Sequence, residues 1–137
     1  MIIDDQLTLS LEQSVVGTAA TAYPSTNTVD LRSSGSDLGS GEPVKLFASV
    51  GATAFVGGSG GVKIDYIQSA NANLSAPDVL ASITTAATPA AGTVLVNMVV
   101  PQNTKRYVGI QFTPLTSNTT AGTINAYLVK DTPTIPT

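Results

Sequence analysis

Apolar and polar residues alternate strictly over several short stretches of this chain, the pattern of a β-strand with one buried face. The first stretch, residues 6–13, places Leu7, Leu9 and Leu11 on one face and polar side chains on the other. A slip of one residue would expose all three leucines, so the register of this strand should be well specified. The other strand-like segments are Thr28–Leu31, Val44–Phe55, Val62–Ser69, Val94–Val100, Arg106–Thr113 and Thr123–Lys130.

Two of these segments predict individual buried positions. In the first, the core-facing residues are expected to be Val44, Leu46, Ala48 and Val50. In the second, they are expected to be Val62, Ile64, Tyr66 and Gln68, with Lys63 and Asp65 on the opposite face. The glycine-rich run 57–61 between them predicts a mobile hairpin tip, because glycine adopts positive φ without steric cost. Residues 77–83 are consistent with either a helical turn or a strand.

Residues that favour helices are scarce, since the chain has two Glu, four Lys and two Arg. About eight short antiparallel strands without helices predict an all-β fold, a jelly-roll-like β-sandwich. An immunoglobulin-like sandwich is less favoured because Cys and Trp are absent. A single domain, 1–137, is expected, with residues 17–41 as a long surface excursion and 131–137 as an extended proline-containing tail. Residues 91–93 and 121–123 both read Ala-Gly-Thr, which predicts a glycine turn before each following strand.

The absence of both His and Cys removes most catalytic and metal-binding chemistry. It excludes disulfides, thiolate nucleophiles, Cys/His zinc sites and Ser-His catalytic arrangements. A glycosidase could use two carboxylates, and Asp37 with nearby carbonyl groups could hold calcium. However, no carboxylate pair, no set of sugar-binding aromatic residues and no EF-hand spacing supports either function. We therefore expect no enzyme activity, no cofactor and no metal site.

The charge balance limits the partners. The net charge is −3 and only 11% of residues are charged, which argues against binding to nucleic acid or to anionic lipid. No apolar run approaches the ~18 residues of a membrane span. The acidic N-terminus lacks the basic and apolar regions of a secretory signal, so we expect a protein that is not exported. Without export, the glycosylation-like sequences at Asn73 and Asn118 are interpreted as turns.

The most informative feature is a gap in the charge pattern: between Val79 and Val129, Lys105 and Arg106 are the only charged residues. A free monomer would leave such sheet faces and edges unprotected against pairing with other chains. Either Thr, Ser and Asn side chains keep these faces hydrated, or an oligomer or larger assembly covers them, and we favour assembly. The basic pair itself is either an exposed strand end or an anchor for an intermolecular ion pair.

Five short motifs, in order along nearly the whole chain, resemble a small family of tailed-bacteriophage capsid cement (decoration) proteins of the kind known from a Bordetella phage. The motifs are Gln6–Ser10, Asn27–Leu31, Asp37–Pro43, Thr104–Tyr107 and Thr120–Thr123. None of them is a catalytic signature, so the resemblance lies in their order and spacing. The chain departs from the family pattern in a longer excursion at 17–26 and in its proline-rich tail.

The resemblance implies a jelly-roll-like sandwich that forms homotrimers on the outside of an icosahedral phage head. Such a trimer would bridge neighbouring subunits of the major capsid protein, so the expected location is the outer surface of the virion, after synthesis in the host cytoplasm. The expected capsid-facing elements are the N-terminal strand 1–11, the loop 35–43 and the basic pair. The individual candidates for capsid or subunit contact are Leu7, Leu9, Asp37, Glu42, Lys105 and Arg106.

Two alternatives stay open at this point. The first is another virion β-domain, from a tail or a receptor-binding head. The second is a carbohydrate-binding module, which is less favoured because four Tyr, three Phe and no Trp leave few aromatic platforms for a sugar.

Overall fold

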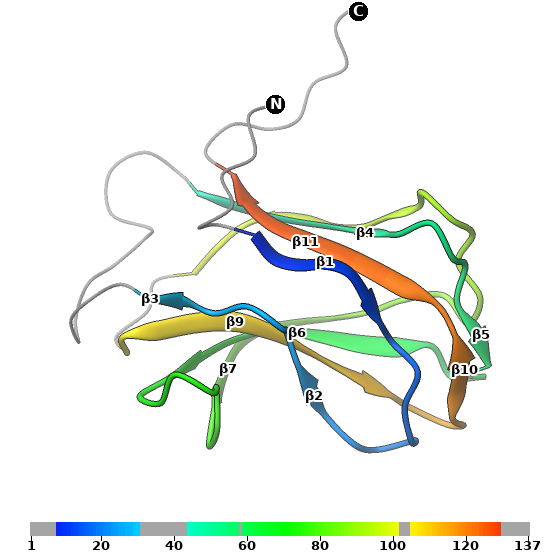
Figure 1. Cartoon of the computed structure of the whole chain (residues 1–137), viewed down its shortest axis with the longest axis horizontal. Helices are drawn as coiled ribbons and strands as arrows, with labels where there is room; N and C mark the ends of the chain where they lie inside the picture. Colours follow the sequence, from blue (N-terminus) through cyan, green and yellow to red (C-terminus); the bar gives the residue numbers. More distant parts are fainter. Residues whose placement is uncertain (1–7, 31–43, 58, 102–104, 130–137) are drawn as a thin grey trace, which may run out of the picture.

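The computed structural model describes residues 8–30, 44–57, 59–101 and 105–129. All regular elements within these ranges are strands, which confirms the all-β prediction (Figure 1). In chain order they are β1 (Thr8–Ser14), β2 (Tyr23–Pro24), β3 (Val29–Asp30), β4 (Lys45–Val50), β5 (Val56–Gly57), β6 (Val62–Ser69), β7 (Asp78–Thr84), β8 (Val94–Val99), β9 (Tyr107–Pro114), β10 (Thr119–Ala121) and β11 (Thr123–Val129). In this part of the chain, no helix is long and apolar enough to cross a membrane. The predicted tail, 131–137, lies outside the described residues.

Apart from β5 and β10, which pair in a separate two-stranded sheet, the strands form two facing sheets with the strand order of a jelly roll (Figure 1). One sheet, the β4 sheet, has the order β1-β11-β4-β8, and the other, the β6 sheet, has the order β2-β9-β6-β7, with β3 also paired to β9. The ladders of both sheets are antiparallel. The chain crosses between the sheets after β1, β3, β4, β7, β8 and β9, so both sheets close around one core. This topology is the predicted β-sandwich.

The core lies between the two sheets and follows the predicted alternation in β4 and β6. The four predicted positions of the first segment, Val44, Leu46, Ala48 and Val50, are all buried. The four of the second segment, Val62, Ile64, Tyr66 and Gln68, are buried as well. Each apolar side chain that is fully buried contributes roughly 1.5–3 kcal/mol, so this shared cluster dominates the stability of the sandwich.

The central strand β6 is also buried on its outer face, where Asp65 has no exposed surface. The Asp65 carboxylate accepts hydrogen bonds from Ser82 Oγ on β7 and from Gln111 Nε2 on β9, the latter at 2.9 Å. Lys63 Nζ lies 3.6 Å from the same carboxylate. A carboxylate is tolerated out of water only with such partners. Asp65 therefore ties both neighbouring strands to the centre of the β6 sheet.

The glycine-rich run 57–61 is not a hairpin tip, contrary to the sequence prediction. β4 and β6 lie in opposite sheets, so the segment between them crosses from one sheet to the other. Gly57 and Gly61 adopt φ values of 83° and 84°, which allow the chain to turn at both ends of the crossing. The prediction failed because alternation indicates which residues face a core but not which strand is the neighbour.

β1 departs from the strict alternation that its sequence predicts. Leu9 is fully buried and Leu11 is 67% exposed, whereas the polar Ser10 is buried. The cause is a bulged pairing with β11, in which the register shifts twice and Glu12 adopts a φ of 48°. Leu7 lies outside the described residues. A bulge on an edge strand discourages pairing with other chains, so this edge of the sandwich is protected.

The carboxylate of Glu12 holds the bulge in place. It accepts hydrogen bonds from Thr123 Oγ1 (2.6 Å), from the backbone N–H of Ala52 (3.0 and 3.1 Å) and from Asn125 Nδ2 (3.3 Å). These donors, with Thr123 first, lower the pKa of Glu12 below its ordinary value. One exposed side chain therefore joins β1 to β11 and to the loop after β4.

Three further local predictions concern residues 77–83, the two Ala-Gly-Thr motifs and the two asparagines of the glycosylation-like sequences. Of the two possibilities for residues 77–83, the strand is correct, as β7. Both Ala-Gly-Thr motifs turn at glycine, with φ values of 82° at Gly92 and 135° at Gly122. The side-chain oxygen of Asn73 accepts from the Ser75 N–H two residues on, as expected of a turn residue. The side-chain oxygen of Asn118 instead accepts from the Ala19 N–H in a different loop, so it joins two loops.

We predict that Glu12→Gln reduces the dependence of stability on pH. Because folding lowers the pKa of Glu12 from its ordinary 4.5, the ionised carboxylate stabilises the fold. This contribution is complete above the ordinary value and is lost as the pH falls through the folded-state pKa. Thermal unfolding should separate the Tm of the wild type from that of the variant at about pH 7, and the difference should shrink progressively as the pH falls below the ordinary pKa of 4.5. A difference in Tm that does not shrink would contradict the assignment.

Candidate functional site

One end of the sandwich gathers most of the charged side chains that the structure describes. β1, β4, β7 and β9 begin there, and β3, β6, β8 and β11 end there, as the pairing of Tyr107 with both Asp30 and Ser69 illustrates. We call it the charged end, and it comprises Asp30, Lys45, Gln68, Ser69, the loop 70–77, Asp78, Lys105, Arg106 and Tyr107. The two basic residues singled out in the sequence therefore lie among acidic and amide side chains from other strands.

Arg106 forms a bidentate ion pair with Asp30, the last residue of β3. The Nε atom lies 2.6 Å from Oδ1, and Nη2 lies 2.8 Å from Oδ2. The guanidinium carbon is also 5.0 Å from the centre of the Tyr107 ring. The hydrogen bonds with Asp30 raise the pKa of Arg106 above its already high ordinary value. Two parallel hydrogen bonds fix both side chains in one geometry, so Arg106 fastens β3 to the start of β9.

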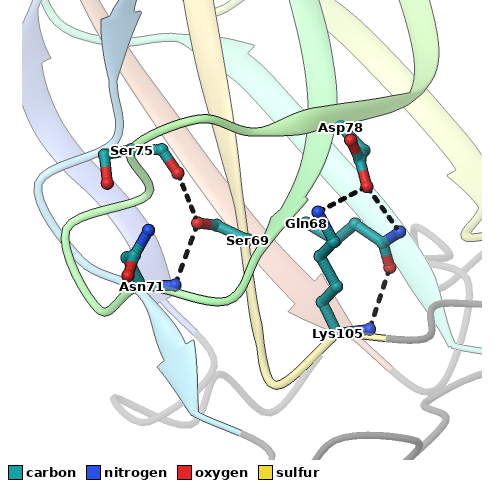
Figure 2. Close-up of polar contacts among 6 residues, drawn as sticks. All are labelled: Gln68, Ser69, Asn71, Ser75, Asp78 and Lys105. Carbon is teal, nitrogen blue, oxygen red and sulfur yellow. Dashed lines mark hydrogen bonds and ion pairs between the residues drawn. The ribbon is translucent and has the colours of Figure 1, made fainter.

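Lys105 is held by a second acidic residue (Figure 2). Its Nζ atom lies 2.7 Å from Asp78 Oδ2 at the start of β7, and its backbone N–H donates to Gln68 Oε1 at 3.2 Å. Gln68 Nε2 donates in turn to Asp78 Oδ2 at 3.4 Å, which closes a ring of three residues. The hydrogen bond and the charge of Lys105 lower the pKa of Asp78. The ring joins the ends of β6, β7 and β9.

The loop 70–77 beside this ring is organised by Ser69, the last residue of β6 (Figure 2). Its buried hydroxyl donates to the Ser75 carbonyl at 2.6 Å and accepts from the Asn71 N–H at 3.0 Å. Leu74 has a φ of 58° and packs against Gly109, where any side chain would collide with it. A leucine in this backbone region is strained by roughly 1–3 kcal/mol, which the packing and the Ser69 hydrogen bonds offset.

Two of the residues predicted to make contacts, Lys105 and Arg106, lie next to one another at this end. The sequence left open an exposed strand end or an intermolecular anchor, and the intrachain pairs with Asp78 and Asp30 favour the first interpretation. Leu9 belongs to the core and has no exposed surface, so we withdraw it as a contact residue. The candidates Leu7, Asp37 and Glu42 lie outside the described residues.

The acidic and amide partners at this end were not identified as a site from the sequence. Asp30 and Arg106 are 76 positions apart, and Gln68 and Lys105 are 37 apart. They meet only because β3 and β6 both pair with β9 in one particular register. The only signal available in the sequence was that each acidic residue, like the basic pair, stands beside the end of a predicted strand.

The charged end offers a rigid contact surface. Its ion pairs each join two chain segments, and its loop is fixed by a buried hydroxyl. Among residues 8–30, 44–57, 59–101 and 105–129, no three His, Cys, Asp or Glu side chains gather as a metal site would require. A preorganised surface of this kind loses little conformational entropy when a partner binds.

We predict that Lys105→Gln raises the pKa of Asp78 towards its ordinary value of 3.8. The physical reason is that the hydrogen bond and the charge of Lys105 are the main causes of the low pKa. An NMR titration of the side-chain carboxyl carbons would measure the change, and Glu12, which has other hydrogen-bond partners, serves as the internal control. An unchanged Asp78 titration would show that the ring in Figure 2 does not persist in solution.

Comparison with known proteins places this chain in a family. The Bbp16 family model matches residues 9–128, a segment that begins in β1 and ends in β11 and so includes both sheets. No curated protein matches the sequence. The name of the family suggests a protein of a Bordetella phage. Because the match extends over nearly the whole described sandwich, we conclude that this chain belongs to the Bbp16 family.

Proposed function

We propose that this chain is a capsid cement protein, which forms homotrimers on the outer surface of a phage head and bridges neighbouring subunits of the major capsid protein. In this proposal the chain is made in the host cytoplasm, acts in the virion and needs no catalysis or cofactor. The observation that carries the proposal is the match to the Bbp16 family over residues 9–128. The jelly-roll sandwich is compatible with it, because such a domain is compact enough to sit on a shell as a separate part.

The charge of the chain supports a place on the outside of the head. A protein on the inner surface faces packaged DNA, and a net charge of −3 would repel it. On the outer surface the same net charge faces solvent, where it favours solubility. The charge therefore argues for the outer surface over the inner one.

The rigidity of the sandwich supports a clamping role. Asp65 joins three strands of the β6 sheet, Glu12 joins β1 to its neighbours, and Arg106 joins β3 to β9. A clamp stabilises a shell by binding its assembled form, and the gain grows with the affinity of each contact. Three chains presented together convert weak single contacts into strong binding without any further chemistry.

In this proposal the charged end faces the capsid. The capsid-facing elements expected from the sequence were residues 1–11, the loop 35–43 and the basic pair. The described chain begins at Thr8, stops at Asp30 before the loop 35–43 and resumes at Val44 after it, all at the charged end. The basic pair directly precedes β9 at the same end. The three predicted contact elements therefore all adjoin one rigid end of the sandwich.

The direct test is to add the purified chain to phage heads that lack it. We expect binding, and a higher Tm of the heads, because a ligand that binds only the assembled shell stabilises it by mass action. Calorimetry would measure the Tm and co-sedimentation would measure the binding. Heads that neither bind the chain nor gain stability would exclude the cement function and favour another virion location.

A charge-swap variant tests how Arg106 contributes. Arg106→Asp alone sets two carboxylates against each other and should weaken head binding, because β3 loosens from β9. The double variant Asp30→Arg, Arg106→Asp restores an ion pair with the charges exchanged. We expect it to recover binding to within about threefold of the wild type, since both intrachain hydrogen bonds can form again. If the double variant binds as poorly as the single one, Arg106 contacts the capsid directly.

A further inference from the structure

The loops and short strands at the end of the sandwich opposite the charged end contain no charged residue of their own, although the Glu12 carboxylate on β1 accepts hydrogen bonds from Ala52 in one of these loops. We call this end the neutral end and define it as the loops and short strands at residues 15–22, 51–57, 59–61, 85–93 and 115–122. It consists of Gly, Ala, Ser, Thr, Val and Pro with single Phe, Leu and Asn residues. All eight charged residues that the structure describes lie elsewhere, four of them acidic and four basic. Five of the eight lie at the charged end, whereas Glu12 contacts the neutral end and Lys63 lies near the start of β6, two residues after Gly61.

The loops of the neutral end are bonded to one another. Thr119 of β10 pairs with Gly57 of β5 on one side and forms an isolated bridge with Gly17 on the other. Across the same end, the backbone N–H of Leu115 donates to the Gly61 carbonyl at 3.1 Å. The turn at Gly122 is required, since an added Cβ would lie 2.6 Å from Phe55. These bonds give the neutral end a fixed surface before any partner arrives.

Exposed apolar side chains are part of this surface. Eight large apolar residues are exposed in the described chain. Val16, Val56 and Leu115 lie in the neutral end, and Val94 directly follows it. Val16 adjoins the Gly17 bridge and Val56 adjoins Gly57, so the two valines lie on either side of β10. An apolar, uncharged and rigid patch is typical of a protein–protein contact.

Charge distribution indicates which partner fits this patch. The net charge of −3 comes from residues 1–7, 31–43 and 130–137, which carry five of the nine acidic and two of the six basic residues. Those segments join the described sandwich at the charged end, where β1 and β4 begin and β3 and β11 end. Two copies of the chain would repel each other most strongly if their charged ends met.

Contact through the neutral ends avoids this repulsion. The eight residues of β6 span roughly 25 Å. That length is about three Debye lengths at physiological salt, so the charged ends of adjoining copies would be almost fully screened from each other.

We infer that the neutral end is the surface through which copies of this chain bind one another. The inference rests on the proposed trimer and specifies its interface: the neutral ends meet around the symmetry axis, and the charged ends point away from it towards the shell. Association then depends on apolar burial at Val16 and Val56, with no contribution from ion pairs.

The test compares aspartate substitutions at valines whose side chains are similarly exposed. Val56 and Val16 in the neutral end are 50% and 51% exposed, and Val99 on β8 at the opposite end is 53% exposed. Val56→Asp and Val16→Asp should raise the concentration at half-dissociation about a hundredfold, because an unpaired charge would be buried at the interface. Val99→Asp is the control and should associate like the wild type. Sedimentation velocity over a concentration series measures association, and an unchanged Tm confirms that each variant is folded.

Raising the salt concentration separates this interface from one built on ion pairs. Association of the wild type should be unchanged or tighter at high salt, since screening reduces repulsion between acidic copies. Weaker association at high salt, or dissociation caused by Val99→Asp alone, would overturn the inference. Trimers of Val56→Asp that no longer bind heads would also overturn it and would place the neutral end on the shell. A monomeric wild type that still stabilises heads would contradict the self-contact while leaving the cement function intact.

Discussion

The burial of one apolar cluster between two sheets determines the rest of this structure. Because the chain crosses repeatedly between the sheets, the core can form only if every long strand spans the sandwich from one end to the other. All loops must then lie at one of two ends. Two sets of residues that are scattered along the sequence are thereby brought together: the ion pairs of Asp30 and Asp78 at one end, and the uncharged loops around β10 at the other.

The two ends suit different tasks, and the energetics of their contacts differ accordingly. The ion pairs of the charged end are exposed to water, so each contributes little to folding, and their main effect is to hold neighbouring strand ends in a fixed arrangement. The loops of the neutral end carry no charged side chain of their own and present half-exposed valines. In a cement protein of the Bbp16 family, as proposed, this division would let copies associate through one end and leave the other free for the capsid.

The sequence was sufficient to predict the class of fold, most strand positions and the inward faces of β4 and β6, because alternation reports burial directly. It was not sufficient to predict neighbours. The run 57–61 looked like a hairpin because strands close in sequence usually pair, yet the core places β4 and β6 in opposite sheets. Leu11 looked buried because the bulge at Glu12 depends on Thr123 and Asn125, more than a hundred residues away. The partners of Lys105 and Arg106 were hidden for the same reason, since a cross-strand ion pair depends on register.

The central claim is that this sandwich works as one part of a shell, in contact with copies of itself and with capsid subunits. Electron cryo-microscopy of the virion at subunit resolution would test it most directly. The account predicts three copies of the jelly roll on the outer surface of the head, with β5 and β10 near the local threefold axis and the start of β9 over the major capsid protein. Isolated copies, copies with the start of β9 turned towards solvent, or a head without any copy would contradict it.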